Sequence, residues 1–177
     1  NRRPYLDLGM RSCSQSVQLD DMDLQEFTHV FISNTAKVMG ADFAPYLPEL
    51  VPYLIDAATR SDVTTGIRED DDDLGRLGGE EEEDDEEFQY IDIRPTFVNF
   101  KRSAITAIGA LARHTGGVFI TFLEQALNAV AAQRTCFHQY VRAEVNAAMP
   151  ELLSCAVDCH GPESVPGTAV VQLHANV

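Results

Sequence analysis

The sequence predicts an all-helical protein, an α-solenoid of helical hairpins interrupted by a long disordered acidic loop. Three observations lead to this fold class. Apolar residues recur at spacings of three and four along most of the chain, as on the buried face of a helix. Two of these segments match each other at a constant offset of 76 residues, and a dense run of carboxylates lies between them. With 177 residues, 45% of them hydrophobic, the chain can bury a sizeable core.

The chain begins with a segment that has no clear periodicity. Residues 1–19 are therefore predicted as a linker or as the end of a preceding repeat. Asp20 and Asp21 then provide an N-terminal cap for a helix that extends to about Met39 and stops at Gly40. The apolar side of this helix is assigned to Leu24, Phe27, Phe31 and Val38.

A second helix, starting near Pro48, completes a predicted hairpin over residues 20–61. An acidic loop with an aromatic patch, residues 62–94, follows, and Pro95 marks the start of a second hairpin over residues 95–134. The apolar stripe of the Pro48 helix consists of Leu47, Leu50, Val51, Leu54, Ile55 and Ala58. The second hairpin carries one stripe of Ala104, Ile105, Ile108, Leu111 and Ala112, and another of Val118, Phe119, Phe122, Leu123, Ala126, Leu127 and Val130.

Residues 135–177 are predicted as a partial third repeat. Its helix is expected from about Phe137 to Val157, bent at Pro150 and closed by Gly161. A short final helix near residues 168–174 is a further expectation. The apolar residues of the main helix are Val141, Val145, Met149, Leu152 and Leu153.

Internal matches indicate that these hairpins are copies of one unit. At an offset of 76, Ala36, Gly40, Phe43, Tyr46 and Leu47 match Ala112, Gly116, Phe119, Phe122 and Leu123. At an offset of 41, Ile108, Gly109, Leu111 and Ala112 match Met149, Pro150, Leu152 and Leu153. A period near forty residues with two helices per unit is typical of HEAT or armadillo-type repeats, which stack into a superhelical rod. An ordinary helical bundle is the alternative.

The carboxylates between the hairpins dominate the charge of the chain. Thirteen of them and one Arg lie between Glu69 and Glu87, so this tract carries −12 of the formal net charge of −15. Such a run repels itself and buries little apolar surface, which predicts a solvated loop that attracts Lys- and Arg-rich ligands. A solubilising role alone, or a tract folded back on Lys101 and Arg102 as a competitive gate, remains open. The candidate cargo-binding carboxylates are Glu69, Asp70, Asp71, Asp72, Asp73, Glu80, Glu81, Glu82, Glu83, Asp84, Asp85, Glu86 and Glu87.

Four polar residues on the second helices of the hairpins are further candidates for cargo contact, because those helices are expected to face the concave surface. They are Glu49, Asp56, Glu124 and Asn128. A solvated helix surface is the alternative interpretation of these positions. Arg142, at the start of the third unit, is expected to make a structural bond between repeats.

No catalytic or metal site and no cofactor is predicted. The histidines show no spacing relation to a nucleophile and an acid, so an enzyme is not expected. Cys155, Cys159 and His160 have metal-like spacing but lack a fourth ligand, and the Asp run lacks the ligand spacing of a calcium loop. The four cysteines are expected to be free thiols in a reducing compartment, and neither a membrane span nor a secretory signal is found.

Two segments resemble HEAT repeats of the importin-beta superfamily: DLQEFTHVFISNTAKVMGADFAPYLPELVPYLI and FKRSAITAIGALARHTGGVFITFLEQAL. The acidic run followed by FQYIDIRPTFV is similar to the acidic loop of beta-karyopherins of the importin-four type. The likeness covers about Met22 to Cys159 and corresponds to a central segment of such a receptor. The N-terminal Ran-binding repeats of the family and part of its cargo surface have no counterpart here.

The resemblance implies a part of a nuclear import receptor that binds basic cargo such as histones, ribosomal proteins and nuclear localisation signals. It also implies partnership with the Ran GTPase and nucleoporins through a full-length parent, and shuttling between cytoplasm and nucleus. Direct contact with nucleic acid and insertion into a membrane are not expected. A non-transport HEAT scaffold of the phosphatase regulatory type and an acidic histone chaperone are the alternative functions.

Overall fold

The computed structural model describes residues 3–19, 21–61 and 95–160. Every regular element in these ranges is helical, which confirms the predicted all-helical class and is consistent with an α-solenoid. The α-helices are α1 (Arg3–Ser16), α2 (Met22–Met39), α3 (Leu47–Thr59), α4 (Pro95–Thr115), α5 (Ile120–Ala132) and α6 (Gln139–His160). Short 3-10 helices connect them, namely η1 (Gly40–Tyr46), η2 (Gly116–Phe119) and η3 (Gln133–Thr135).

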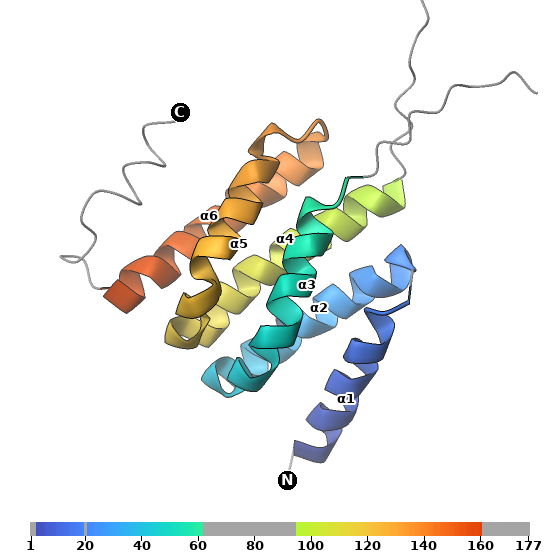
Figure 1. Ribbon diagram of the computed structural model, residues 1–177, viewed down its shortest axis with the longest axis vertical. Helices are drawn as coiled ribbons and strands as arrows, with labels where there is room; N and C mark the ends of the chain where they lie inside the picture. The colour runs from blue at the N-terminus through green and yellow to red at the C-terminus, as the bar shows by residue number, and fades with distance from the viewer. Residues whose placement is uncertain (1–2, 20, 62–94, 161–177) are drawn as a thin grey trace, which may run out of the picture.

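The helices form two layers (Figure 1). In one layer α4 lies between α2 and α6 and packs against both, whereas α3 and α5 pack side by side in the other. The helices α2 and α3, joined by η1, form one hairpin, and α4 and α5, joined by η2, form the next. We call α2, α4 and α6 the first-helix layer, and α3 and α5 the second-helix layer.

The turn of each hairpin begins with a glycine of positive φ. Gly40 and Gly116 have φ of 58° and 59°, the left-handed region in which a side chain is strained. Each follows directly on the last residue of a first-layer helix, α2 or α4. The equivalent residues Phe43 and Phe119, three positions further on, are completely buried. Sequence, backbone and burial therefore agree at the two turns.

The helix boundaries have identifiable local causes. The Asp21 side chain accepts a hydrogen bond of 3.0 Å from the backbone N–H of Leu24, so the predicted cap of α2 is confirmed. As expected, α4 begins at Pro95, where a missing N–H costs nothing. The helix α6 continues through the exposed Pro150.

The buried core lies between the two layers. It contains most of the predicted stripes of α3, α4, α5 and α6, including Leu50, Leu54, Ile105, Leu111, Val130 and Leu152. Each such side chain contributes about 1.5 to 3 kcal/mol by leaving water, so the contact between the layers provides most of the favourable free energy of folding.

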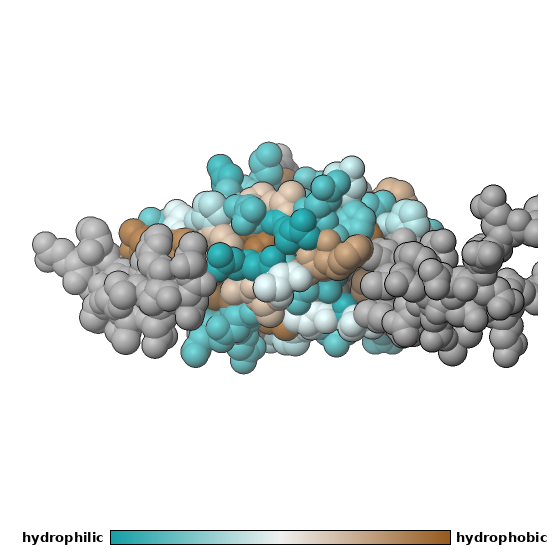
Figure 2. All heavy atoms as spheres, turned by 90° about the horizontal axis from the view of Figure 1, so that it is seen from above, coloured by the Kyte–Doolittle hydropathy of each residue, from teal (hydrophilic) through white to brown (hydrophobic). Residues whose placement is uncertain are grey.

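The predicted apolar side of α2 is wrong. Phe27 is 72% exposed and Val38 70%, and Leu24 and Phe31 are also on the surface. The buried residues are instead Gln25, Thr28, His29, Ile32, Thr35 and Ala36. Both sets recur at helical spacing. In the buried set, Gln25, Thr28 and His29 have hydrogen-bond partners outside α2, which offsets the cost of burying their polar groups. Figure 2 shows one face of the molecule, on which apolar side chains lie exposed among hydrophilic ones.

Residues 3–16 form a helix, α1, so the irregular linker that was one of two alternatives for this segment is wrong. Met10 and Cys13, one turn apart, are buried at the inner side of α1. A Cβ atom at Gly9 would lie 2.7 Å from Cζ of Phe31, so a larger residue there would require the Phe31 ring to move. In the sequence, the buried side of α1 is represented only by Met10 and Cys13, and two residues are too few to show a helical period.

Several predictions lie outside the described residues. They concern the acidic loop with its aromatic patch (residues 62–94), Gly161, and the short helix expected near residues 168–174. None of the described helices is both long and apolar enough to cross a membrane.

Candidate functional site

The second-helix layer carries the four polar candidates on its surface. Glu49 and Asp56 are exposed on α3, and Glu124 and Asn128 are exposed on the neighbouring α5. Asp56 is paired with Arg60 at 3.3 Å one turn later, an exposed ion pair worth less than about 1 kcal/mol. The structure thus places all four on one layer, and neither Glu49 nor Glu124 forms an ion pair with another described residue.

Glu49 also lines a groove of about 430 Å³ between α1 and α3. Met10, Arg11, Ser14 and Gln15 of α1 and Tyr46 form the rest of its lining. This groove brings an acidic and a basic side chain from different helices to one depression. Sequence reasoning did not find it, because α1 was not recognised as a helix.

The thirteen carboxylates of the acidic tract lie outside the described residues, but the helices on either side show where the tract attaches. The described chain leaves α3 through Arg60 and Ser61 and returns at Pro95. Lys101 Nζ donates a hydrogen bond of 3.1 Å to the backbone carbonyl of Arg60. This bond ties α4, six residues after Pro95, to the residue that follows α3.

Lys101 and Arg102 do not form an open basic patch. Lys101 is only 7% exposed, its ammonium lies 5.8 Å from the centre of the Phe97 ring, and burial lowers its pKa. Arg102 lies 3.7 Å from Glu144 and stacks over Tyr140. Their described surroundings therefore weaken the idea that the acidic tract folds back onto them.

A hydrogen-bonded network that sequence reasoning missed joins three helices. His29 of α2 is fully buried, with Nδ1 2.7 Å from Oγ of Ser103 on α4 and Nε2 2.8 Å from the hydroxyl of Tyr53 on α3. Burial lowers the pKa of His29 to about 4, against a smaller opposing effect of the Phe100 backbone, and burial raises the pKa of Tyr53. The imidazole is therefore neutral at pH 7.

The direction of these bonds argues against a nucleophilic serine. The Ser103 hydroxyl also lies 2.8 Å from the carbonyl oxygen of Phe100, which can only accept. Both bonds exist together when Ser103 donates to that carbonyl and His29 Nδ1 donates to Ser103. We therefore assign the Nδ1–H tautomer, with the Tyr53 hydroxyl donating to Nε2. A catalytic histidine would have to accept the serine proton, the reverse of this arrangement.

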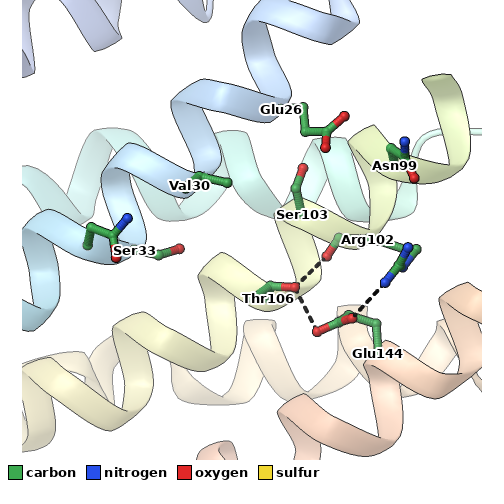
Figure 3. A pocket seen from close by; sticks show the side chains of 9 residues that line it. Glu26, Val30, Ser33, Asn99, Arg102, Ser103, Thr106 and Glu144 are labelled. Carbon is green, nitrogen blue, oxygen red and sulfur yellow. Dashed lines mark hydrogen bonds and ion pairs between the residues drawn. The ribbon is translucent and has the colours of Figure 1, made fainter.

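A second groove, of about 340 Å³, crosses the first-helix layer (Figure 3). The helix α2 contributes Glu26, Val30, Ser33 and Asn34, α4 contributes Asn99, Arg102, Ser103 and Thr106, and α6 contributes Glu144. Thr106 donates a hydrogen bond of 2.7 Å to Glu144, which connects α4 to α6 along one edge. Ser103 joins this groove to the buried His29 network.

The remaining candidates have structural surroundings. Arg142 donates hydrogen bonds of 2.8 and 2.6 Å to the carbonyls of Cys136 and Phe137, so its bonds are structural but lie within the α5–α6 connection instead of between repeats. Burial, followed by the nearby Cys159, raises the pKa of Cys155 to about 12. In the described ranges, no three His, Cys, Asp or Glu side chains are grouped closely enough to hold a metal ion.

Comparison with known proteins gives two similarities. The chain is 27% identical over 190 residues to a probable importin subunit beta-4 of Schizosaccharomyces pombe, covering 93% of this chain and 16% of that protein. It is 24% identical over 153 residues to importin subunit beta-3 of Saccharomyces cerevisiae, covering 85% of this chain and 14% of that protein. No model of a protein family matches the chain.

The chain thus spans about a sixth of the length of these relatives, 16% and 14%. Their names suggest a family of nuclear import receptors, and both similarities extend over most of this chain. Together with the all-helical, two-layered fold, they support a place for this chain in the importin-beta superfamily.

Proposed function

We propose that this chain is a segment of a nuclear import receptor, of the importin-four type, that binds basic cargo. The observation that carries the proposal is the similarity of 93% and 85% of the chain to two importin subunits. The cargo-binding groups are the carboxylates between Glu69 and Glu87 together with Glu49, Asp56, Glu124 and Asn128. Histones, ribosomal proteins and nuclear localisation signals have the Lys- and Arg-rich character that suits them.

The architecture that we propose is a stack of HEAT repeats. Its units are the end of a preceding repeat at residues 1–19, one repeat at 20–61, the acidic loop at 62–94, a repeat at 95–134 and a partial repeat at 135–177. The matching turns at Gly40 and Gly116, with φ of 58° and 59°, support the equivalence of the two full hairpins. In such a stack each hairpin buries its apolar stripe against its neighbours.

Binding in this proposal comes from many weak contacts. Thirteen carboxylates close together attract cations over distances of about the Debye length, about 8 Å at physiological salt, and raise the rate of encounter. Each exposed pair contributes at most about 1 kcal/mol. Loss of one carboxylate is therefore expected to change affinity little, whereas loss of the tract removes most of the salt-dependent part.

The test measures binding of a histone tail peptide to the chain across a range of salt concentrations. One variant lacks residues 69–87, and a matched variant keeps their length but replaces each Asp by Asn and each Glu by Gln. We expect both to lose at least about tenfold in affinity and most of the salt dependence. Unchanged affinity in both variants would contradict the role of the tract and favour a HEAT scaffold in which it is a spacer.

A second experiment addresses transport. In a full-length parent containing this segment, Ran bound to GTP is expected to release the histone peptide, as in a receptor that shuttles between cytoplasm and nucleus. The same parent is expected to bind nucleoporin fragments. Retention of the peptide in the presence of Ran bound to GTP would favour an acidic histone chaperone.

A further inference from the structure

The groove on the first-helix layer contains hydrogen-bonding groups that have no partner among the described residues. Asn34 and Asn99 are exposed on α2 and α4, and neither carboxamide has a hydrogen bond among the described residues. A carboxamide offers two donors and one acceptor, which matches the alternating N–H and C=O groups of an extended peptide. Ser33 and Ser103 are less available, because their hydroxyls donate to the carbonyls of His29 and Phe100.

The charge in this groove is distributed unevenly. Arg102 and Glu144 lie 3.7 Å apart, so their charges largely compensate each other. Glu26, half-buried at the end of the groove near Asn99, has no ion pair or hydrogen bond among the described residues. The uncompensated charge of the groove is therefore a carboxylate beside a free carboxamide, and charge complementarity favours a cationic ligand group at that end.

The length of the groove limits the size of the ligand. Glu26 and Asn34 are eight residues apart on α2, which at 1.5 Å per residue corresponds to about 12 Å along the helix. An extended peptide advances about 3.3 to 3.6 Å per residue, so about three or four residues span this distance. Val30, half-way between the two ends and 49% exposed, provides an apolar contact for the ligand between them.

We propose that this groove binds a short extended peptide segment with a Lys or Arg side chain. The basic side chain lies between Glu26 and Asn99, the peptide backbone bonds to the Asn34 and Asn99 carboxamides, and a small apolar side chain contacts Val30. The inference rests on the proposed function for the basic character of the ligand, but it adds a site on the layer opposite to α3 and α5. Basic ligands would then contact both layers of the fold.

The test uses the 177-residue chain with the neutralised acidic tract as background, so that binding to the tract does not contribute. The probe is the blocked tetrapeptide acetyl-Ala-Lys-Val-Ala-amide, and the readout is the NMR signals of the Asn34 and Asn99 side-chain amides. We expect both signals to shift in a saturable manner. Glu26→Gln is expected to weaken binding about fivefold, the effect of one exposed ion pair of about 1 kcal/mol, while Asp42→Asn, at an exposed position of η1 outside the groove, leaves it unchanged.

Three results would overturn the site. Shifts that remain equally strong with norleucine in place of Lys would show that the cation is not recognised. Tighter binding of the corresponding Glu tetrapeptide would point to Arg102, whose Nε is buried without a hydrogen-bond partner, as the true ligand group. No shift at either Asn signal would exclude the groove. Since the background lacks the charged tract, these results are distinguishable from a failure of the histone-binding test above.

Discussion

His29 and Ser103 are 74 residues apart in the sequence, yet Nδ1 of His29 lies 2.7 Å from Oγ of Ser103. Through this bond and the second one to Tyr53, one imidazole connects α2, α3 and α4 in the interior. A lost partner in such a network leaves a buried polar group unsatisfied, which costs about 1 to 3 kcal/mol. The contact between the two hairpins therefore depends on a polar centre as well as on apolar burial.

This imidazole predicts a specific pH dependence of stability. The folded pKa of His29 is about 4, below the usual value of 6.5 that the unfolded chain retains. Below pH 6.5 the unfolded chain binds a proton that the folded chain does not, so stability falls as the pH falls, and the effect ends near pH 4. We expect a loss of about 1.5 kcal/mol between pH 6.5 and 5.

The measurement is urea denaturation at several pH values, in the chain and in His29→Gln. The difference in unfolding free energy between the two proteins is expected to shrink by that amount towards pH 5, because only the original chain carries the titrating group. An NMR titration of the His29 ring provides an independent check of the folded pKa. Equal slopes for both proteins, or a ring that titrates near 6.5, would contradict this prediction.

Lys101 is expected to stabilise the fold through its bond to the Arg60 carbonyl. Lys101→Met keeps the buried hydrocarbon but removes the donor, and we predict a loss of about 1 to 2 kcal/mol in unfolding free energy. Lys37→Met, at an exposed position of α2, is the matched control and should change stability by less than about 0.5 kcal/mol. Similar effects of both substitutions would show that the buried bond contributes nothing.

The turn glycines offer a test of backbone strain. Gly116 has φ of 59°, and a Cβ atom there would meet no other atom within 4 Å, so Gly116→Ala introduces strain without a clash. We predict a loss of about 1 to 2 kcal/mol in thermal or urea denaturation. Gly117, the next residue, lacks a positive φ and its Cβ would be 3.9 Å from Cys159, so Gly117→Ala should have almost no effect. The prediction is wrong if the two variants are equally stable.

Two phenylalanines, Phe27 on α2 and Phe43 in η1, test whether Phe27 belongs to the buried core. Phe43 is completely buried after α2, and Phe43→Ala is expected to cost about 3 to 5 kcal/mol. Phe27 is 72% exposed, and Phe27→Ala is expected to cost less than about 1 kcal/mol. The measurement is calorimetric melting of the two variants. A large loss of stability in Phe27→Ala would contradict the structure and support the apolar stripe expected from sequence.

Five of the six α-helices could be predicted from sequence, because Leu, Ile, Val and Ala recur at helical spacing and glycine or proline marks the ends. The buried side of α2 could not be predicted, because two sets of residues on α2 share that spacing. Hydropathy favours the set that is exposed in the structure. Its buried polar residues are explained only by partners on other elements, such as Ser103 and Tyr53 for His29. Helix α1 offered only Met10 and Cys13 as buried positions, too few for a period.

The acidic chemistry of the candidate site could be predicted from the sequence, whereas the position of the groove could not. A run of carboxylates is visible in any sequence, and the exposed positions of Glu49 and Glu124 followed from the hairpin register. The groove on the first-helix layer combines residues from Glu26 to Glu144, and no local pattern connects them. Such a site depends on how α2, α4 and α6 are arranged, which the spacing of apolar residues does not specify.

The Lys101–Arg60 bond has a consequence for how this gene can vary. The helices α3 and α4 pack directly on each other, and the bond ties α4 to Arg60, the residue at which the chain leaves α3. Their association therefore does not depend on an unbroken chain between Ser61 and Pro95. Insertions, deletions or even a proteolytic cut in that interval should leave the two halves joined, so evolution can adjust the intervening segment independently of the scaffold.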